Sequence, residues 1–267
     1  MILTLPTRAS YPPFLNKAIE LANLMVHTGH RFEQYLHASA ATQSRLNNVT
    51  VEFQEDRVSG GWNAYGWSDR SVDASTIFVN RVLRDHLERI TTEEASCSDS
   101  HEYQCIVFMI AVALFHECAE LTLHWQGVLD PPSKFLGGVG SCAERRLFFG
   151  LCRLKIQKNP SRRISRLKCS DGKWTPDMRI MNVVFHVLKS KIWEMKPEHL
   201  AKFFRSEATE DSEKKIVLVD VNPYVKVKGA SMHLGCKRPR APPMDPNTWI
   251  LRPHRKTSKP TKEIKQR

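Results

Sequence analysis

Four side chains that can bind a metal ion or move a proton lie close together in the stretch FHECAELTLHW. They are His116, Glu117, Glu120 and His124. The eleven residues before them, 105–115, carry no polar group stronger than a thiol. At about 100° per residue, His116, Glu120 and His124 fall within about 80° of one another on one helix face. Imidazole and carboxylate groups are zinc ligands and general acids or bases, so the stretch predicts a polar site at the end of an apolar helix.

A single long helix is predicted to position these side chains. The stretch 102–126 contains no proline or glycine, and Gly127 follows directly, with Pro131 and Pro132 beyond it. Glycine and proline end helices, so the stretch predicts one helix of about six or seven turns. Because its first half is apolar on every side, we expect it to be buried at the centre of a domain. The apolar run 105–115 is too short to span a bilayer.

The spacing of the polar residues suits zinc chemistry. Two ligands one helical turn apart can bind the same ion, and a carboxylate beside the first can take a proton from metal-bound water. This pattern predicts His116 and Glu120 as metal ligands and Glu117 as the catalytic base. A carboxylate at position 120 would make a bound zinc ion a weaker Lewis acid than a second histidine would. The candidates for a third ligand are His124, Cys142 and Glu144.

A structural alternative needs no metal. In it, His116 and Glu120 pair with each other, or with Arg145 and Arg146 farther along the chain. Burying Glu120 without a cationic neighbour would cost several kcal/mol or force its protonation. If Glu120 is buried, we therefore expect zinc, an arginine or a protonated histidine beside it.

The remaining patterns predict an α+β fold. Apolar spacing predicts helices at 14–26, 81–90 and 141–149, strands at 49–54 and 76–80, and a bent hairpin at 60–69. After these, we expect a mainly helical C-terminal region, with helices at 175–193 and 197–204 and two strands within 216–228. Residues 153–168 hold seven basic residues and no acidic one, which is typical of a solvated linker or an anion-facing loop.

The predicted organisation has four parts. They are an N-terminal arm (1–13), a domain with a small sheet and the buried motif helix (14–150), a helical and β region (151–228) and a basic tail (229–267). The chain has a net charge of +12, and from residue 226 onward twelve Lys and Arg face only Asp245 and Glu263. The tail lacks periodicity, so we expect it to be disordered.

Cysteine usage bears on the cellular compartment. The seven cysteines form an odd set without a CxxC pair, which favours buried thiols in a reducing compartment. The first residues, MILTLPTRAS, lack the apolar core of a secretory signal. We therefore expect an intracellular protein, cytoplasmic or nuclear, that does not bind membranes. No oligomeric state follows from the sequence.

The segment FHECAELTLHWQG, followed by PPSKFLGGVGSCAERRLFFG, resembles zincin-type metallopeptidase-like proteins found in many fungi. The resemblance covers roughly residues 70–150 and implies a zincin-like domain, a zinc cofactor and a peptide or protein substrate. It implies His116 as first ligand and Glu117 as base. Glu120 replaces the second histidine of HExxH, and Gly138 replaces the third-ligand glutamate. The resemblance thus implies a degenerate HExxE motif in a protein that is weak or inactive as a zinc-dependent hydrolase.

The basic tail predicts a different function, that of a non-enzymatic interaction protein which binds an acidic partner or nucleic acid. We expect association with such a partner to weaken as salt rises, because salt screens exposed charges. Deleting residues 229–267 is expected to abolish it. Binding measured with and without the tail, at low and high salt, tests this prediction. Association that persists at high salt, or without the tail, would contradict it.

Overall fold

The structure is a computed structural model of the 267-residue chain. It describes residues 3–28, 39–55, 64–69, 71–93, 100–128, 138–157, 179–187, 191–204 and 224–226. The predicted basic tail and most of the predicted basic linker therefore lie outside the described residues.

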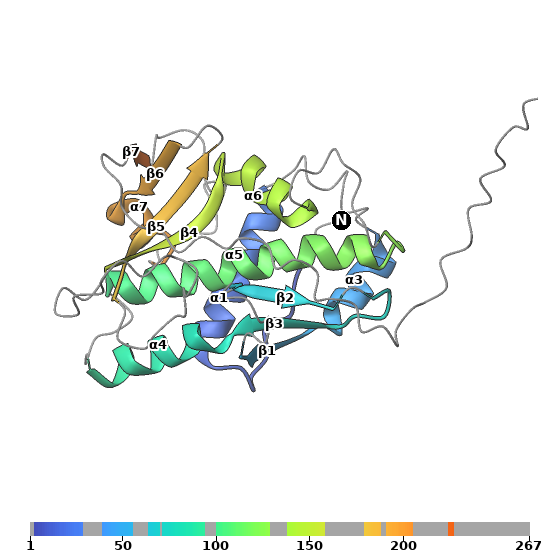
Figure 1. Ribbon diagram of the computed structural model, residues 1–267. Coiled ribbons are helices and arrows are strands. Elements are labelled where there is room, and N and C mark those ends of the chain that lie inside the picture. Colours follow the sequence, from blue (N-terminus) through green and yellow to red (C-terminus); the bar gives the residue numbers. More distant parts are fainter. Residues whose placement is uncertain are drawn as a thin grey trace, which may run out of the picture.

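Helix α5 (His101–His124) runs through the middle of the fold (Figure 1), as the sequence predicts. Ser100 begins it, accepting a hydrogen bond from the Tyr103 amide. Every residue from Gln104 to Phe115 is buried. Within the described part of the chain, α5 alone is long and apolar enough to cross a membrane. However, 89% of its most apolar window is buried inside the protein, as in a core helix.

A three-stranded sheet packs on one side of α5. Its strands are β1 (Thr50–Gln54), β2 (Gly66–Ser68) and β3 (Thr76–Asn80). The strand order is β1-β3-β2, with β3 parallel to β1 and antiparallel to β2. Helix α3 (Ala40–Asn47) precedes this sheet and α4 (Arg81–Glu93) follows it. The predicted strands at 49–54 and 76–80 and the helix after them are confirmed. Of the predicted hairpin, residues 60–63 lie outside the described residues, and β2 pairs with β3.

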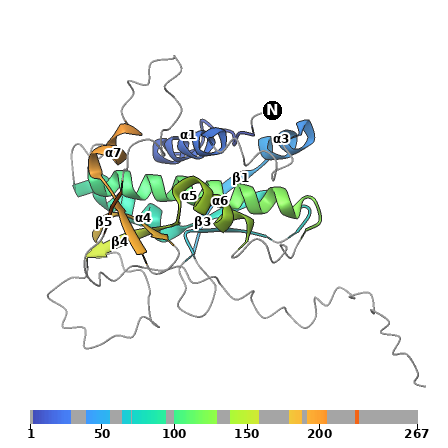
Figure 2. The same cartoon turned by 90° about the horizontal axis from the view of Figure 1, so that it is seen from above.

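Helix α1 (Pro13–Thr28) packs along α5 and confirms the predicted amphipathic helix. Proline at its first position suits a helix start. Figure 2 shows α1 and α3 on the same side of α5. The segment Leu3–Arg8 of the predicted arm also belongs to this layer, because Leu3 and Leu5 are buried in the core.

The prediction of a mainly helical C-terminal region is wrong for its described part. This part is a four-stranded antiparallel sheet in the order β4-β5-β6-β7. Its strands are β4 (Leu151–Gln157), β5 (Arg179–Val187), β6 (Lys191–Met195) and β7 (Tyr224–Lys226). Ile180, Val183 and Val184 fit helical spacing, but β-branched side chains favour strands. The short helix α7 (Pro197–Lys202) is confirmed, and β7 lies within the predicted strands at 216–228, whose other residues lie outside the described ones.

The prediction of a linker or loop at 153–168 is also wrong at its start, because residues 153–157 belong to β4. Cys152 and Leu154 are fully buried, whereas the intervening Arg153 is half-buried, which is the alternation of a strand. Lys155 reaches Glu194 of β6, with Nζ 2.9 Å from the carboxylate. The basic side chains thus lie along the more exposed face of a sheet strand.

The α+β class is confirmed, since separate helices and small sheets pack around α5 (Figure 1). The four-stranded sheet contacts the first half of α5 through β5, and α6 (Val139–Phe148) covers a later part of the helix. Phe108 of α5, Phe148 of α6 and Phe185 of β5 form one aromatic contact group. This packing places α6 over the polar half of α5.

Candidate functional site

The polar half of α5 meets α6 in a group of charged side chains. We call this group the His116 cluster. Its members are His116, Glu117 and Glu120 of α5 and Glu144 of α6. Helical spacing brings the three residues of α5 near one another. Glu144 joins them because α6 docks on α5.

His116 and Glu144 form the shortest contact in the cluster. His116 Nδ1 is 2.5 Å from Glu144 Oε1, and only 5% of the Glu144 side chain is exposed. An ionised carboxylate can only accept, so the imidazole donates from Nδ1. The second oxygen of Glu144 accepts the backbone N–H of Cys152 at 2.8 Å. Glu144 therefore joins α5, α6 and the start of β4.

Glu120 faces the other side of the same imidazole. Its Oε1 lies 3.9 Å from His116 Nε2 and accepts the backbone N–H of Gly140 at 3.0 Å. The side chain of Glu120 is 16% exposed. The pairing of His116 with Glu120 that the structural alternative predicts is therefore present. A peptide N–H from the first turn of α6 supplies a further contact to the carboxylate.

Gly140 presses its backbone against the His116 ring. A Cβ at position 140 would lie 2.2 Å from His116 Cδ2 and 2.5 Å from Nε2, far inside normal contact distances. Only glycine lets α6 approach α5 this closely. Gly138, which the resemblance aligns with the third ligand, instead lies at the N-cap of α6 with φ 94°. It is thus Gly140, and not Gly138, whose backbone lies beside Nε2 of His116.

The carboxylates around His116 control its protonation. Burial by itself lowers the pKa of His116. The hydrogen bond to Glu144 and the charges of Glu144, Glu117 and Glu120 outweigh that effect and raise the pKa to about 9. At neutral pH the ring is then an imidazolium, with a proton on each nitrogen. A metal ion that binds this ring would have to displace one of these protons.

Glu117, the predicted base, is buried and points toward β2. Its Oε2 accepts a hydrogen bond from Ser68 Oγ at 2.9 Å. Strand β2 comes close to α5 at Gly66, where an added Cβ would lie 3.3 Å from Ala113 Cβ. Sequence reasoning missed both Ser68 and Gly140. Neither shows any signal in the sequence, because each contact depends on how two elements approach.

The candidates for a third ligand lie in different places. Glu144 reaches Nδ1 of His116, whereas Glu120 faces Nε2. Cys142 is half-buried in α6. His124 is buried two turns farther along α5, about 12 Å from His116 along the axis. Over the described ranges, no three His, Cys, Asp or Glu side chains are grouped so that they could hold a metal ion.

Comparison with protein-family models, curated proteins and solved structures gave no match to this chain. The zincin-like resemblance and its assignment of ligands therefore stay predictions.

Proposed function

We propose that this chain is a metallopeptidase-like protein without hydrolytic activity, in which the residues of a former zinc site hold two helices together. The observation that carries this proposal is the contact of Gly140 with both His116 and Glu120. The first turn of α6 lies where the two candidate ligands would have to share an ion. The residues present do not fit a catalytic zinc site.

The distances around Glu120 support this reading. A zinc ion needs a nitrogen and an oxygen about 2.0–2.2 Å away, each with a lone pair directed at it. Glu120 Oε1 already accepts the Gly140 amide, and the backbone of Gly140 is packed against the Nε2 edge of the ring. A catalytic site also needs an open position for water, and α6 covers this edge. Binding zinc here would require α6 to move.

The contact between His116 and Glu144 supports an origin in a metal site. A histidine that binds zinc through one ring nitrogen usually donates its other N–H to a carboxylate, which fixes the ring. His116 makes this kind of contact through Nδ1. The cluster therefore has the carboxylate that orients a ligand, whereas glutamate and glycine stand at the ligand positions that the resemblance implies. This combination is expected of a degenerate zinc site.

Glu117 also takes a structural role in this proposal. A base in a zinc hydrolase acts on metal-bound water, which the metal makes acidic. Here Glu117 accepts a hydrogen bond from the Ser68 hydroxyl, and this contact connects β2 to α5. With Glu144 bound to the Cys152 amide, the cluster links β2, α5, α6 and β4. The alternative function of the basic tail stays a prediction, since residues 229–267 lie outside the described part.

Metal analysis of the purified, untagged chain tests the proposal. We expect far less than one zinc ion per chain after equilibration with zinc and removal of the excess, because the ligand positions are occupied by protein groups. His116→Ala should give the same low value. About one zinc per chain in the wild type, lost in His116→Ala, would overturn the proposal.

Peptide hydrolysis provides a second measurement. Glu117→Gln keeps the shape of the side chain and removes its basicity, so it would abolish zinc-dependent hydrolysis. We expect wild type and Glu117→Gln to give the same background on a mixed peptide substrate. A wild-type rate that Glu117→Gln removes without loss of the fold would show that catalysis persists.

A further inference from the structure

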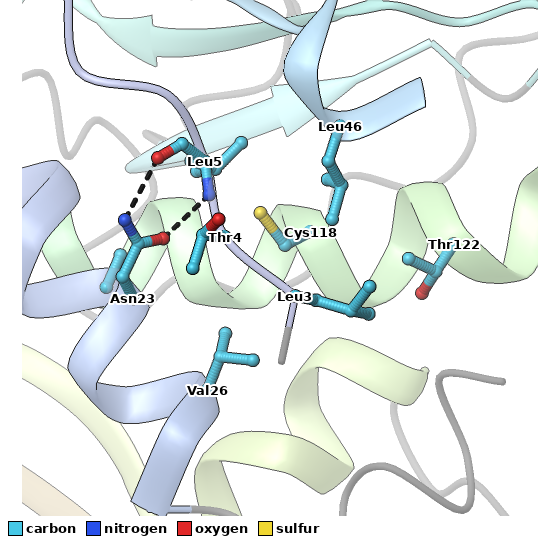
Figure 3. Close-up of a pocket in the computed structure, with 9 residues that line it drawn as sticks. Leu3, Thr4, Leu5, Asn23, Val26, Leu46, Cys118 and Thr122 are labelled. Carbon is cyan, nitrogen blue, oxygen red and sulfur yellow. Dashed lines mark hydrogen bonds between the residues drawn. The ribbon is translucent and has the colours of Figure 1, made fainter. Parts of the chain in front are cut away.

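Leu3, Thr4 and Leu5, in the segment Leu3–Arg8, lie beside Cys118 of α5 (Figure 3). Cys118, which this segment covers, is two residues after His116 and so about 200° around the helix. The segment passes between α1 and α3, and side chains from both helices hydrogen-bond to its backbone. It has the geometry of a bound peptide within its own chain.

Two carboxamide side chains hold consecutive residues of the segment. Gln43 of α3 accepts the N–H of Thr4 at 2.8 Å and donates to its carbonyl at 2.9 Å. Asn23 of α1 accepts the N–H of Leu5 at 2.7 Å and donates to its carbonyl at 2.9 Å (dashed lines in Figure 3). Successive residues of an extended chain direct their polar groups to opposite sides. Side chains of α1 and α3 therefore bond to the segment's backbone from its two sides, as neighbouring strands would in a sheet.

A third carboxamide repeats the arrangement at Arg8. Asn16 of α1 accepts the Arg8 N–H at 3.1 Å and donates to the Arg8 carbonyl at 2.9 Å. These six contacts go to backbone atoms, so they favour an extended shape whatever the side chains; Gln43 also donates to the hydroxyl of Thr4 at 3.3 Å. Asparagine is a poor residue for a helix interior, yet α1 has Asn16 and Asn23 on the face that meets the segment.

Side-chain preference at this site comes from two leucines and from Arg8, whose guanidinium donates to the carbonyl of Val49 at 3.1 Å. Leu3 and Leu5 are 3% and 4% exposed, and both line one small cavity. Ala22, Val26, Leu46 and Cys118 are among the residues that line it. Burial, with the nearby charge of Glu117, raises the pKa of the Cys118 thiol, so the thiol stays protonated and acts as part of an apolar wall.

We propose that α1, α3 and α5 form a binding site for an extended peptide with leucine-sized side chains at two alternate positions. The segment Leu3–Arg8 fills the site in cis. Six backbone contacts and two apolar side chains are the recognition elements of an added β-strand. A peptide from a partner with the same pattern can make all of them once the segment leaves. The linked segment competes at an effective concentration in the millimolar range, so it keeps the site closed to weak ligands.

Hydrogen exchange of the intact, unmodified chain tests whether the segment leaves the site on its own. The amides of Thr4, Leu5 and Arg8 should exchange at least about a hundred-fold faster than the buried amides of α5, because the segment opens without global unfolding. Exchange of these three amides at the rate of the α5 core would make the segment an inseparable part of the core. That result would overturn the proposal.

A binding measurement tests the site itself. The double variant Leu3→Asp, Leu5→Asp should release the segment from the site of the full chain. A fluorescent synthetic peptide, MILTLPTRAS, should bind this variant and bind the wild-type chain at least about ten-fold more weakly. The same peptide N-methylated at Leu5 cannot donate to Asn23 and should lose binding. A folded double variant that does not bind the unmodified peptide, or binds both peptides equally, refutes the proposal. If the double variant does not fold, the hydrogen-exchange rates of the Thr4, Leu5 and Arg8 amides in the unmodified chain decide whether the proposal stands.

Discussion

Replacing Gly140 with alanine is expected to lower the free energy of unfolding by about 2–3 kcal/mol. The new Cβ would lie 2.2 Å from His116 Cδ2, so α6 must shift away from α5 or the ring must turn. Either movement lengthens the contact of Glu120 with the Gly140 amide and the contact of His116 with Glu144. At an ordinary helical position the same change would instead stabilise the helix by about 1 kcal/mol. Urea unfolding of the two proteins measures the difference.

Two further variants separate crowding from other effects. In the double variant His116→Ala, Gly140→Ala the ring is gone, so the second substitution should cost much less than it does alone, a coupling that a double-mutant cycle measures. Gly127→Ala is the contrasting variant, because φ is +76° there and no atom lies within 4 Å of an added Cβ, so it introduces backbone strain without crowding. We expect it to cost about 1 kcal/mol. Gly140→Ala at wild-type stability would contradict the close packing.

The second large effect is a loss of stability at alkaline pH. The pKa of His116 is raised to about 9 in the folded chain, against about 6.5 when unfolded. A raised histidine pKa stabilises the fold fully below about pH 6.5, and this contribution disappears as the pH rises through about 9. The whole contribution is on the order of 3 kcal/mol. Unfolding free energies measured from pH 6 to 10 should therefore fall across that range.

Comparison with His116→Gln isolates the histidine from other groups that titrate at high pH. Glutamine can still donate to Glu144 but has no charge to lose. The difference in unfolding free energy between wild type and His116→Gln should be largest near pH 6. It should shrink toward pH 10, as the imidazolium that faces Glu117, Glu120 and Glu144 loses its proton. A constant difference across this range would mean that His116 does not carry a proton at neutral pH.

The elements that could be predicted are those whose patterns are local. The apolar run before His116 and the glycine after Gln126 determine where α5 lies, and amphipathic spacing predicts α1. For β5 the local pattern predicts a helix, because Ile180, Val183 and Val184 recur at helical spacing. Pairing with β4 and β6 decides the outcome there, and that pairing joins segments far apart in the sequence. The local sequence pattern therefore does not predict the pairing of β5 with β4 and β6.

The candidate site divides in the same way. Helical spacing is enough to place His116 and Glu120 together, since both belong to α5. The sequence identifies Glu144 only as one of three candidates for a third ligand, and it does not predict the contact of Glu144 with His116 Nδ1. Gly140 has no side chain, so no sequence pattern marks it as part of the site. Its importance comes from the distance between two helices, which spacing within one helix cannot reveal.

The position of β3 between β1 and β2 has a consequence for the order of folding. Both outer strands precede β3 in the chain, and they pair with β3 rather than with each other. During synthesis, β1 and β2 must therefore wait for residues 76–80 before this sheet can form. Because domains fold as their segments emerge, the first compact intermediate that contains this sheet should appear only when β3 has left the ribosome. Helix α4 follows β3 without a gap, so the sheet and that helix should form together.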